Sequence, residues 1–292
     1  MTADSGAGPG SLAVLEIDGA DAANFLHAQL CGDVLGLAPG HCRFTAWCSP
    51  KGRVIATMLI ARGTDGFRAF LCRDIAARVR QRLAMFVLRA RVQIRDRSGD
   101  VAVAGSAGPS APVPGADAAW EYAEQDGLAA AALPGSGGTR WLLCGAPERL
   151  AGLDDGDADR WMREDVAAGL AWIGASLSET FLPQELDLER LGGLSHTKGC
   201  YPGQEVVARV RSRGRQKREL RAFTFASAPP AAGTAIVTAG GAPAGRIIAA
   251  VPGGTASGRG LAVMERTVLS GGEALHIESP TGSVLRLDAG QH

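Results

Sequence analysis

The chain has 292 residues, of which 46% are hydrophobic and 21% charged, a balance typical of a soluble protein with one or two domains. Its 30 basic and 30 acidic residues cancel, which argues against a global electrostatic attraction to nucleic acid or to an anionic membrane. No stretch is apolar for long enough to span a bilayer, and residues 1–10 lack the features of a secretory signal. We therefore expect a cytoplasmic protein with a disordered tail at residues 1–10.

Short strands and helices alternate in the pattern predicted for the first hundred residues. Asp21 is placed to cap a first helix, and Asp74 to cap a second one with an apolar stripe. The SPKG sequence at residues 49–52 is a strong turn signal between two strands. Strands are predicted at residues 12–17, 42–47, 53–61, 67–72 and 91–95.

The middle of the chain continues this mixture of hairpins and helices. Residues 104–119 are rich in Ala, Gly and Pro and are interpreted as a surface loop. Strands are predicted around residues 120–122, 129–133 and 139–144, and a helix from 159 to 168 that ends at Gly169. Hairpins without regular strand–helix–strand repeats indicate an α+β fold.

The last quarter of the chain contains only short apolar runs separated by Gly/Pro turns. The runs lie at residues 220–225, 234–238, 245–251, 260–263, 274–278 and 283–287. Evenly spaced short strands without a helical period are typical of a small β-barrel. We therefore predict a larger region at 11–218, made of two subdomains, and a C-terminal β-barrel at 219–292.

The six cysteines include no CxxC pair, and free thiols are expected. Cys31, Cys72 and Cys144 lie in apolar runs and are interpreted as small buried hydrophobes. Cys200 differs, because it stands in a Gly/Pro-rich loop, two residues after Lys198. A neighbouring cation favours the thiolate form of a cysteine, so Cys200 is the predicted reactive residue, with Lys198 as its partner.

Polar and basic residues follow Cys200. Glu205 could cap the next element or could accept a hydrogen bond from the amine edge of a ligand. Arg209, Arg211, Arg213 and Arg215 occupy every second position, so in an extended chain they would share one face. Such a face is either a solvated strand surface or an anion site for a carboxylate, a phosphate or RNA.

The segment KGCYPGQE at residues 198–205 resembles the signature of the YgfZ-type folate-binding proteins, which act in iron–sulfur cluster assembly and repair. These proteins are structural relatives of the glycine-cleavage T-protein, an aminomethyltransferase. The resemblance extends over nearly the whole chain. Further matching positions are Gly19-Ala20-Asp21 with Gln29 and Asp33, residues 50–53, Gly169, residues 181–184 and Gly192-Gly193.

The resemblance implies a T-protein-like α+β region that binds tetrahydrofolate or another folate derivative, followed by the barrel. It implies Cys200 and Lys198 as catalytic residues, with Cys200 a possible transient contact of an iron–sulfur cluster. The cofactor-binding residues expected from it are Trp161, Tyr201, Gln204, Glu205 and Arg209. Trp161 offers a flat ring for stacking on a pterin, although a tryptophan at a helix start is more often a core residue. An early tryptophan of some family members is replaced here by Leu12.

Three functions compete at this point. The resemblance favours a folate-dependent factor that assists iron–sulfur enzymes and their assembly factors, rather than a turnover enzyme. The first alternative is a folate-dependent aminomethyltransferase of the T-protein type. The second is an RNA-binding module that uses the arginines between residues 209 and 221, against which the zero net charge counts.

Overall fold

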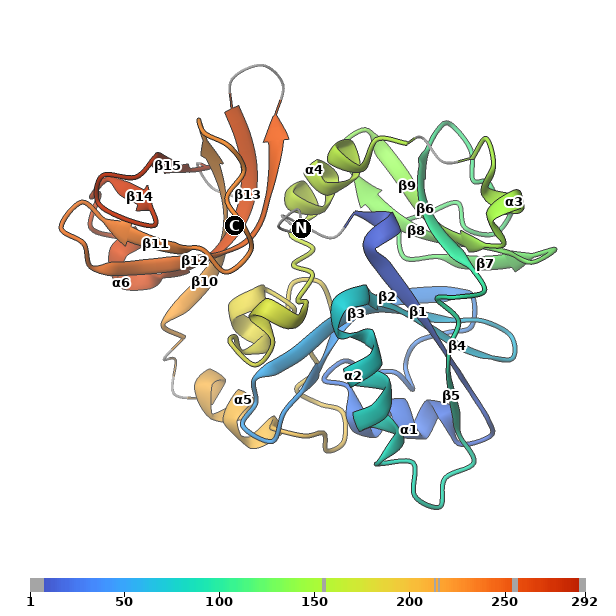
Figure 1. Ribbon diagram of the computed structural model, residues 1–292. Helices are drawn as coiled ribbons and strands as arrows, with labels where there is room; N and C mark the ends of the chain where they lie inside the picture. Colours follow the sequence, from blue (N-terminus) through green and yellow to red (C-terminus); the bar gives the residue numbers. More distant parts are fainter. Residues whose placement is uncertain (1–7, 154–155, 213, 215, 254–256, 289–292) are drawn as a thin grey trace.

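The computed structural model describes residues 8–153, 156–212, 214, 216–253 and 257–288. In the view of Figure 1, a barrel and a four-stranded sheet lie next to each other above a five-stranded sheet. Every strand pair in the described residues is antiparallel. The predicted α+β class is confirmed.

The five-stranded sheet has the order β2-β3-β4-β1-β5. Its central strands are buried over most of their length, as expected for a sheet covered on both faces. The predicted strands are present with boundaries shifted by one or two residues. They are β1 (Leu12–Asp18), β2 (His41–Cys48), β3 (Val54–Arg62), β4 (Gly66–Cys72) and β5 (Gln93–Asp96).

Two helices accompany this sheet, α1 (Ala22–Gln29) and α2 (Arg73–Ala84). Asp21 occupies the predicted N-cap position of α1 but makes no side-chain capping bond, and Asp74 lies in the first turn of α2, where Cys72 is the N-cap. Each aspartate bonds instead to a backbone that is distant in the sequence. The Asp21 carboxylate accepts a hydrogen bond from the Arg91 amide at 2.8 Å. The Asp74 carboxylate accepts one from the Ala175 amide at 2.9 Å. Tertiary contacts therefore replace the local capping bonds that the residue types suggest.

The four-stranded sheet has the order β6-β9-β8-β7. Its strands are β6 (Ala102–Ala107), β7 (Tyr122–Gln125), β8 (Leu128–Gly135) and β9 (Gly138–Gly145). The predicted loop at 104–119 is wrong for residues 104–107, which pair with β9. Two helices follow, α3 (Pro147–Leu150) and α4 (Ala158–Ala168). The predicted end of α4 is confirmed, since Gly169 adopts a left-handed conformation with φ of 73°.

The chain then contains little regular structure until α5 (Gln204–Ser212). Two short 3₁₀ turns, η2 (Ala175–Leu177) and η3 (Pro183–Leu186), interrupt this stretch. At the N-terminus, a further 3₁₀ turn η1 (Pro9–Ser11) buries Pro9, so the predicted disorder is wrong for residues 8–10. Residues 1–7 of that predicted tail lie outside the described part of the chain.

The C-terminal strands close into a barrel in the order β10-β13-β12-β11-β14-β15. All six predicted strands are present, and the barrel begins at Arg218, one residue before the predicted boundary. The strands are β10 (Arg218–Phe225), β11 (Ala235–Thr238), β12 (Pro243–Gly253), β13 (Ser257–Glu265), β14 (Leu275–Ile277) and β15 (Val284–Leu287), with α6 (Arg266–Leu269) after β13.

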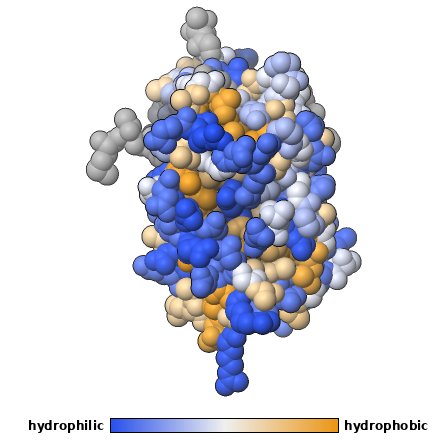
Figure 2. Space-filling model, turned by 90° about the vertical axis from the view of Figure 1, so that its right-hand side faces the viewer, coloured by the Kyte–Doolittle hydropathy of each residue, from blue (hydrophilic) through white to orange (hydrophobic). Residues whose placement is uncertain are grey.

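None of the helices in the described part of the chain combines the length and the apolar character that crossing a bilayer requires. Figure 2 shows one face of the molecule, on which hydrophilic side chains are interspersed with smaller hydrophobic patches. One of these patches lies at the lower end of the molecule.

Candidate functional site

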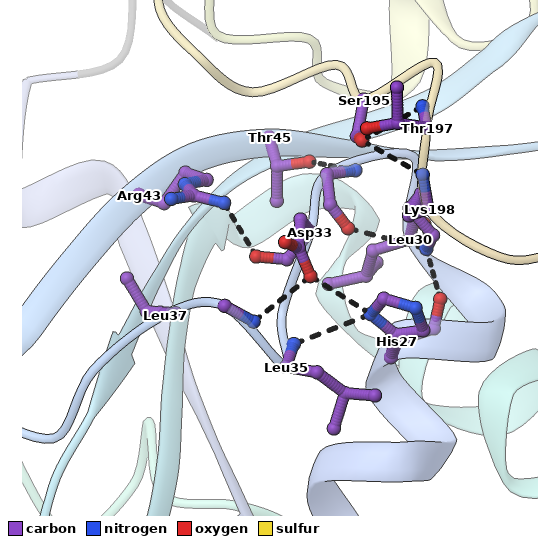
Figure 3. A network of polar contacts seen from close by, with 12 residues as sticks. His27, Leu30, Asp33, Leu35, Leu37, Arg43, Thr45, Ser195, Thr197 and Lys198 are labelled. Carbon is purple, nitrogen blue, oxygen red and sulfur yellow. Dashed lines mark hydrogen bonds and ion pairs between the residues drawn. The ribbon is translucent and has the colours of Figure 1, made fainter.

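The KGCYPGQE segment begins in a loop that Lys198 fastens to the end of α1. The Lys198 ammonium donates to the carbonyl oxygens of Leu30, at 2.6 Å, and Gly32, at 3.3 Å, and also to that of His27 (Figure 3). Carbonyls at the end of a helix lack partners within the helix and carry partial negative charge, which favours a cation. Burial nevertheless lowers the pKa of Lys198 to about 8.

This geometry changes the expected role of Lys198. Its ammonium lies among carbonyl oxygens and 5.2 Å from the centre of the Tyr201 ring, and it makes no hydrogen bond to the Cys200 thiol in the described part of the chain. Lys198 is therefore an anchor of the loop that carries Cys200. The expected pairing of its charge with the Cys200 thiol is not present.

The loop is also hydrogen-bonded to strand β2 and to the segment that follows α1. The Thr45 hydroxyl donates to the Gly193 carbonyl at 2.7 Å, and the Ser195 amide donates to the Cys31 carbonyl at 2.9 Å. A methyl group at Gly193 would collide with the carbonyl oxygen of Phe44. Only glycine allows the loop to lie so close to β2.

The end of the segment packs against the turn between β2 and β3. Gly203 has a φ of +82°, and a Cβ atom there would lie 2.5 Å from the Cα of Gly52. Gly52 itself has a φ of +74°. The two glycine-containing segments that carried the family resemblance, residues 50–53 and 198–205, are therefore in direct contact.

Cys200 is the exposed cysteine of the six, and the other five are buried. The prediction of burial is confirmed for Cys31, Cys72 and Cys144. Burial raises the pKa of the Cys144 thiol to about 11, which keeps this thiol protonated and unreactive near neutral pH. Accessible thiol chemistry in the described residues is thus concentrated at Cys200.

A cavity of about 410 Å³, here called the motif cavity, lies beside the loop. The Tyr201 side chain is 6% exposed, and its hydroxyl has no hydrogen-bond partner among the described residues. Burial raises the pKa of Tyr201, so its phenol is neutral. The cavity is lined by Ser195, His196, Tyr201, Gln204, Ala208, Arg211 and Ser212.

A second cavity of about 460 Å³, the junction cavity, lies where α4 and the following segment meet the barrel. Aliphatic side chains of Val166, Leu220 and Leu261 form part of its wall. No local pattern in the sequence marks this site, because its members come from distant parts of the chain. Four charged residues also line it, namely Asp187, Arg190, Arg221 and Asp288.

The segment around residue 189 is close to residues of both cavities. Asp187 and Arg190 line the junction cavity. Between them, the Glu189 carboxylate lies 3.4 Å from His196 Nε2 and 3.8 Å from the Arg211 guanidinium, both of which line the motif cavity. One short segment therefore lines the junction cavity and contacts two residues that line the motif cavity.

The buried carboxylate of Glu185 links the segment before the loop to the barrel. Glu185 is 5% exposed, and its carboxylate accepts two hydrogen bonds of 3.0 Å from Arg218 and one of 2.8 Å from the Leu182 amide. Nη1 of Arg53 lies 3.6 Å from Oε2 of the same carboxylate. The ion pair joins η3 to the first barrel strand, and both charges are satisfied, as buried charges require.

The five residues expected to bind a cofactor do not converge on one place. Tyr201 and Gln204 line the motif cavity. Glu205 and Arg209 are exposed on α5. Trp161 is 3% exposed and packs against Arg140, whose guanidinium carbon lies 4.2 Å from its ring centre. It borders a third cavity, of about 490 Å³, beside the four-stranded sheet.

The predicted extended arginine strip is wrong where the structure describes it. Arg209 and Arg211 lie on helix α5, where residues two apart point in different directions. Arg213 and Arg215 lie outside the described residues. Farther along, Arg221 is engaged by Glu219. The helix therefore disperses the positive charge that an extended chain would have aligned.

A resident metal site is not evident in the described residues, since no three His, Cys, Asp or Glu side chains form a group that could hold an ion. Cys200 could supply one ligand to a cluster, whereas iron–sulfur clusters usually need four protein ligands.

Three comparisons, with a family model, with solved structures and with curated sequences, each find proteins that are similar to this chain. Residues 10–113 match the family model described as the GCVT N-terminal domain. The fold is similar to the glycine cleavage system aminomethyltransferase T from Bartonella henselae, with a TM-score of 0.76 over 97% of this chain and 84% of that one. Sequence identity with that structure is 14%, so the similarity establishes the fold alone.

Curated relatives are more similar in sequence. The tRNA-modifying protein YgfZ of Edwardsiella ictaluri is 31% identical over 229 residues, covering 70% of this chain and 66% of that protein. The protein of the same name from Sodalis glossinidius is 30% identical over 239 residues, covering 76% of this chain and 72% of that protein. The matched part is thus about two thirds or slightly more of these relatives' own length. On this sequence similarity, the chain belongs to the YgfZ family.

Proposed function

We propose that this protein binds a folate, such as tetrahydrofolate, and assists the assembly or repair of iron–sulfur clusters in client enzymes. Cys200 is the proposed reactive residue. The observation that carries the proposal is the exposure of Cys200, alone among the six cysteines, on a loop anchored by Lys198 and Gly203. Such anchoring holds a thiol in one place for a partner to reach.

The junction cavity is the proposed folate site. Its volume of about 460 Å³ lies in the range of small-molecule sites. Arg190 and Arg221 pair with Asp187 and Glu219, and their remaining guanidinium N–H groups are the proposed donors to the carboxylates of a folate's glutamate tail. Asp187 and Asp288 pair with Arg190 and Arg259, and their remaining acceptor positions are proposed to face the amino and ring N–H groups of a pterin. Val166 and Leu261 offer apolar contact to its ring. A bound folate would supply one-carbon or redox chemistry.

The motif cavity is the alternative folate site. It contains Tyr201 and Gln204, two of the residues expected from the sequence to bind the cofactor, and the Tyr201 hydroxyl is a buried donor without a partner among the described residues. A ligand group that accepts from this hydroxyl would remove the cost of leaving it unsatisfied. Glu205 and Arg209, exposed on the same helix, are then proposed contacts for the outer part of the ligand.

An iron–sulfur cluster would pass through this protein as cargo. The Cys200 thiol would lose its proton to solvent, and its thiolate would replace one ligand of an iron atom without change in the oxidation state of the iron. The client would supply the remaining ligands. Because the similar proteins are named tRNA-modifying proteins, we propose that the clients include enzymes that modify tRNA.

Folate binding tests the site. Calorimetric titration with 5-formyltetrahydrofolate is expected to show binding to the wild type and at least about tenfold weaker binding to Arg221→Ala. Arg286→Ala, an exposed arginine of β15, is the matched control and should bind as the wild type does. If only Gln204→Ala weakens folate binding, the folate site is the motif cavity. If the wild type does not bind folate, the folate assignment is refuted.

The cysteine role needs a separate test. Cells carrying Cys200→Ser are expected to show lower activity of iron–sulfur enzymes under oxidative stress, with the protein present at wild-type level. The control Cys72→Ser alters a buried thiol outside the loop. Normal enzyme activity in the Cys200→Ser cells would contradict the proposed role of the thiol.

The fold also favours a second candidate, a folate-dependent aminomethyltransferase. Formation of methylene-tetrahydrofolate from an aminomethyl-lipoyl carrier would distinguish it. Turnover that depends on this chain would establish the transferase and displace the assembly factor as the primary function.

A further inference from the structure

A cluster of exposed apolar side chains follows helix α2. Met85 is 72% exposed, Phe86 48% and Leu88 87%. They are three of the five large hydrophobic residues that are exposed among those the structure describes. We call residues 85–91 the apolar tip. Figure 2 shows hydrophobic and strongly hydrophilic atoms together at the lower end of the molecule, the end at which the connection from α2 to β5 lies in Figure 1.

The tip has a defined conformation. Successive short-range hydrogen bonds close it, from the Phe86 amide to the Leu83 carbonyl at 2.9 Å and from the Ala90 amide to the Val87 carbonyl at 2.7 Å. Leu88 has a φ of 45°, in the left-handed region that residues other than glycine, asparagine and aspartate rarely adopt. A strained backbone that displays an exposed leucine, where glycine or asparagine would be easier, suggests selection for a function.

Positive charge surrounds the apolar side chains. Residues 78–91 contain five arginines and no acidic residue. Arg78 and Arg82 share the single carboxylate of Glu179, and Arg91 pairs with Asp21. Arg80 and Arg89 have no acidic partner among the described residues. The surface around the tip therefore carries excess positive charge.

The tip is connected to the candidate site through Trp47. The Phe86 and Trp47 rings meet edge to face with centres 6.4 Å apart. Trp47 lies near the end of β2, just before the turn that packs against Gly203. Figure 1 shows α5 and the connection from α2 to β5 at the same end of the molecule. A partner bound at the tip would therefore lie at the end that carries the motif helix.

We propose that the apolar tip docks a partner protein whose surface offers an apolar groove with an acidic rim. Met, Phe and Arg are among the residues enriched at protein interfaces, and the excess of arginine selects an acidic partner. Three projecting side chains bury little area, which corresponds to a transient encounter. The docking surface itself is argued from the apolar tip alone. If the partner is an iron–sulfur client enzyme, that identification rests on the proposed function.

The residue types favour a protein over the other possible occupants. A nucleic acid is bound through phosphates and stacked bases, for which Met85 and Leu88 contribute nothing specific. A membrane-surface segment usually presents an extended amphipathic helix, whereas here the helix ends at Ala84 and the apolar residues form a compact turn.

The experiment selects peptides from a library of random 16-residue sequences on the immobilised full-length protein. The selected peptides are expected to combine apolar with acidic residues and to bind more weakly as salt is raised. Their affinity should fall at least about tenfold with Leu88→Ser and with Arg89→Glu. Val284→Ser and Arg286→Glu, exposed positions on the barrel, are the matched controls and should leave the affinity unchanged.

The same variants are tested against transfer RNA and against vesicles of phosphatidylglycerol and phosphatidylcholine. Binding of either that is lost with Leu88→Ser would overturn the proposal, as would peptides that bind Leu88→Ser as well as the wild type, or the selection of no peptide. Cys200→Ser is expected to bind the peptides normally. Failure of docking is thereby separated from failure of the proposed thiol chemistry.

Discussion

Gly203 and Gly52 touch backbone to backbone, with the position of a Cβ at Gly203 only 2.5 Å from both the Cα and the amide nitrogen of Gly52. This contact joins the turn between β2 and β3 to the beginning of α5. Two segments about 150 residues apart in the sequence thereby form one structural unit around Cys200.

Gly203→Ala should therefore destabilise the protein by more than conformational strain alone. The new methyl group would meet the Ser49 carbonyl and the Gly52 backbone, neither of which can move like a flexible side chain. Gly192→Ala is the matched control, since Gly192 also has a positive φ, of 66°, but has open space around it. Urea unfolding should show a loss of roughly 1 kcal/mol for the control and at least about 2 kcal/mol for Gly203→Ala. Equal losses would contradict the packing argument.

Lys198→Met should release the loop that carries Cys200. The substitution keeps the apolar stem but leaves carbonyls of Leu30 and Gly32 without their charged donor. We expect a loss of about 1–3 kcal/mol in unfolding free energy and faster proteolysis of residues 195–200. Lys217→Met, at an exposed position, serves as the control. Unchanged proteolysis would show that the ammonium does not anchor the loop.

His27 should make the stability sensitive to mild acid. Burial and the nearby Lys198 lower the pKa of His27 below its ordinary value of 6.5, against the opposing effect of Asp33. Below pH 6.5 the unfolded chain therefore takes up a proton that the folded protein binds less readily, and stability falls as the pH falls. His27→Gln should lose less stability than the wild type between about pH 7.5 and 5.5 in urea unfolding, and an equal loss in the two proteins would contradict the role of His27.

A single thiol should react rapidly in the native protein. Five of the six cysteines are buried, so a disulfide reagent such as dithionitrobenzoate is expected to modify one equivalent quickly and the remaining five only after unfolding. Cys200→Ser should abolish the rapid phase, and Cys144→Ser should leave it unchanged. A rapid phase that survives in Cys200→Ser would place the accessible thiol elsewhere.

Asp165→Ala should be strongly destabilising. The Asp165 carboxylate accepts hydrogen bonds from Arg140, at 2.5 Å, and from Trp172 Nε1, at 2.9 Å, and the side chains of Asp165 and Arg140 are almost fully buried. Removing the carboxylate leaves a buried guanidinium without its counter-charge, which costs about 3–5 kcal/mol. Asp159→Ala on the same helix should cost less than about 1 kcal/mol in the same thermal or urea unfolding. Similar costs for the two variants would refute the importance of the buried pair.

Regular structure with a clear local pattern was predictable from the sequence. All six barrel strands are marked by apolar runs between Gly/Pro turns, and Gly169 marks the end of α4 because its left-handed conformation suits glycine. The prediction of an extended arginine strip was wrong. Arginines at alternating positions are compatible with a strand, whereas the segment after Gly203 folds as a helix. Local pattern alone does not distinguish these outcomes when tertiary packing selects one of them.

The candidate site was predictable in part. Exposure of Cys200 followed from its glycine-rich surroundings, and the structure agrees. The hydrogen-bond partners of the Lys198 ammonium were not predictable, because these carbonyl oxygens belong to residues about 170 positions earlier in the chain. The junction cavity was missed for the same reason, since Arg190 and Asp288 are brought together only when the barrel packs on α4.

The segment around Glu189 also links two equilibria. A ligand in the junction cavity that shifted the backbone at Arg190 would also shift the neighbouring Glu189, which lies near His196 and Arg211. Thermodynamic linkage makes such an effect reciprocal, so occupancy of the motif cavity would change affinity at the junction cavity by the same factor. If the backbone shifts in this way, ligands in the two cavities would bind cooperatively, in a positive or a negative sense, without touching each other.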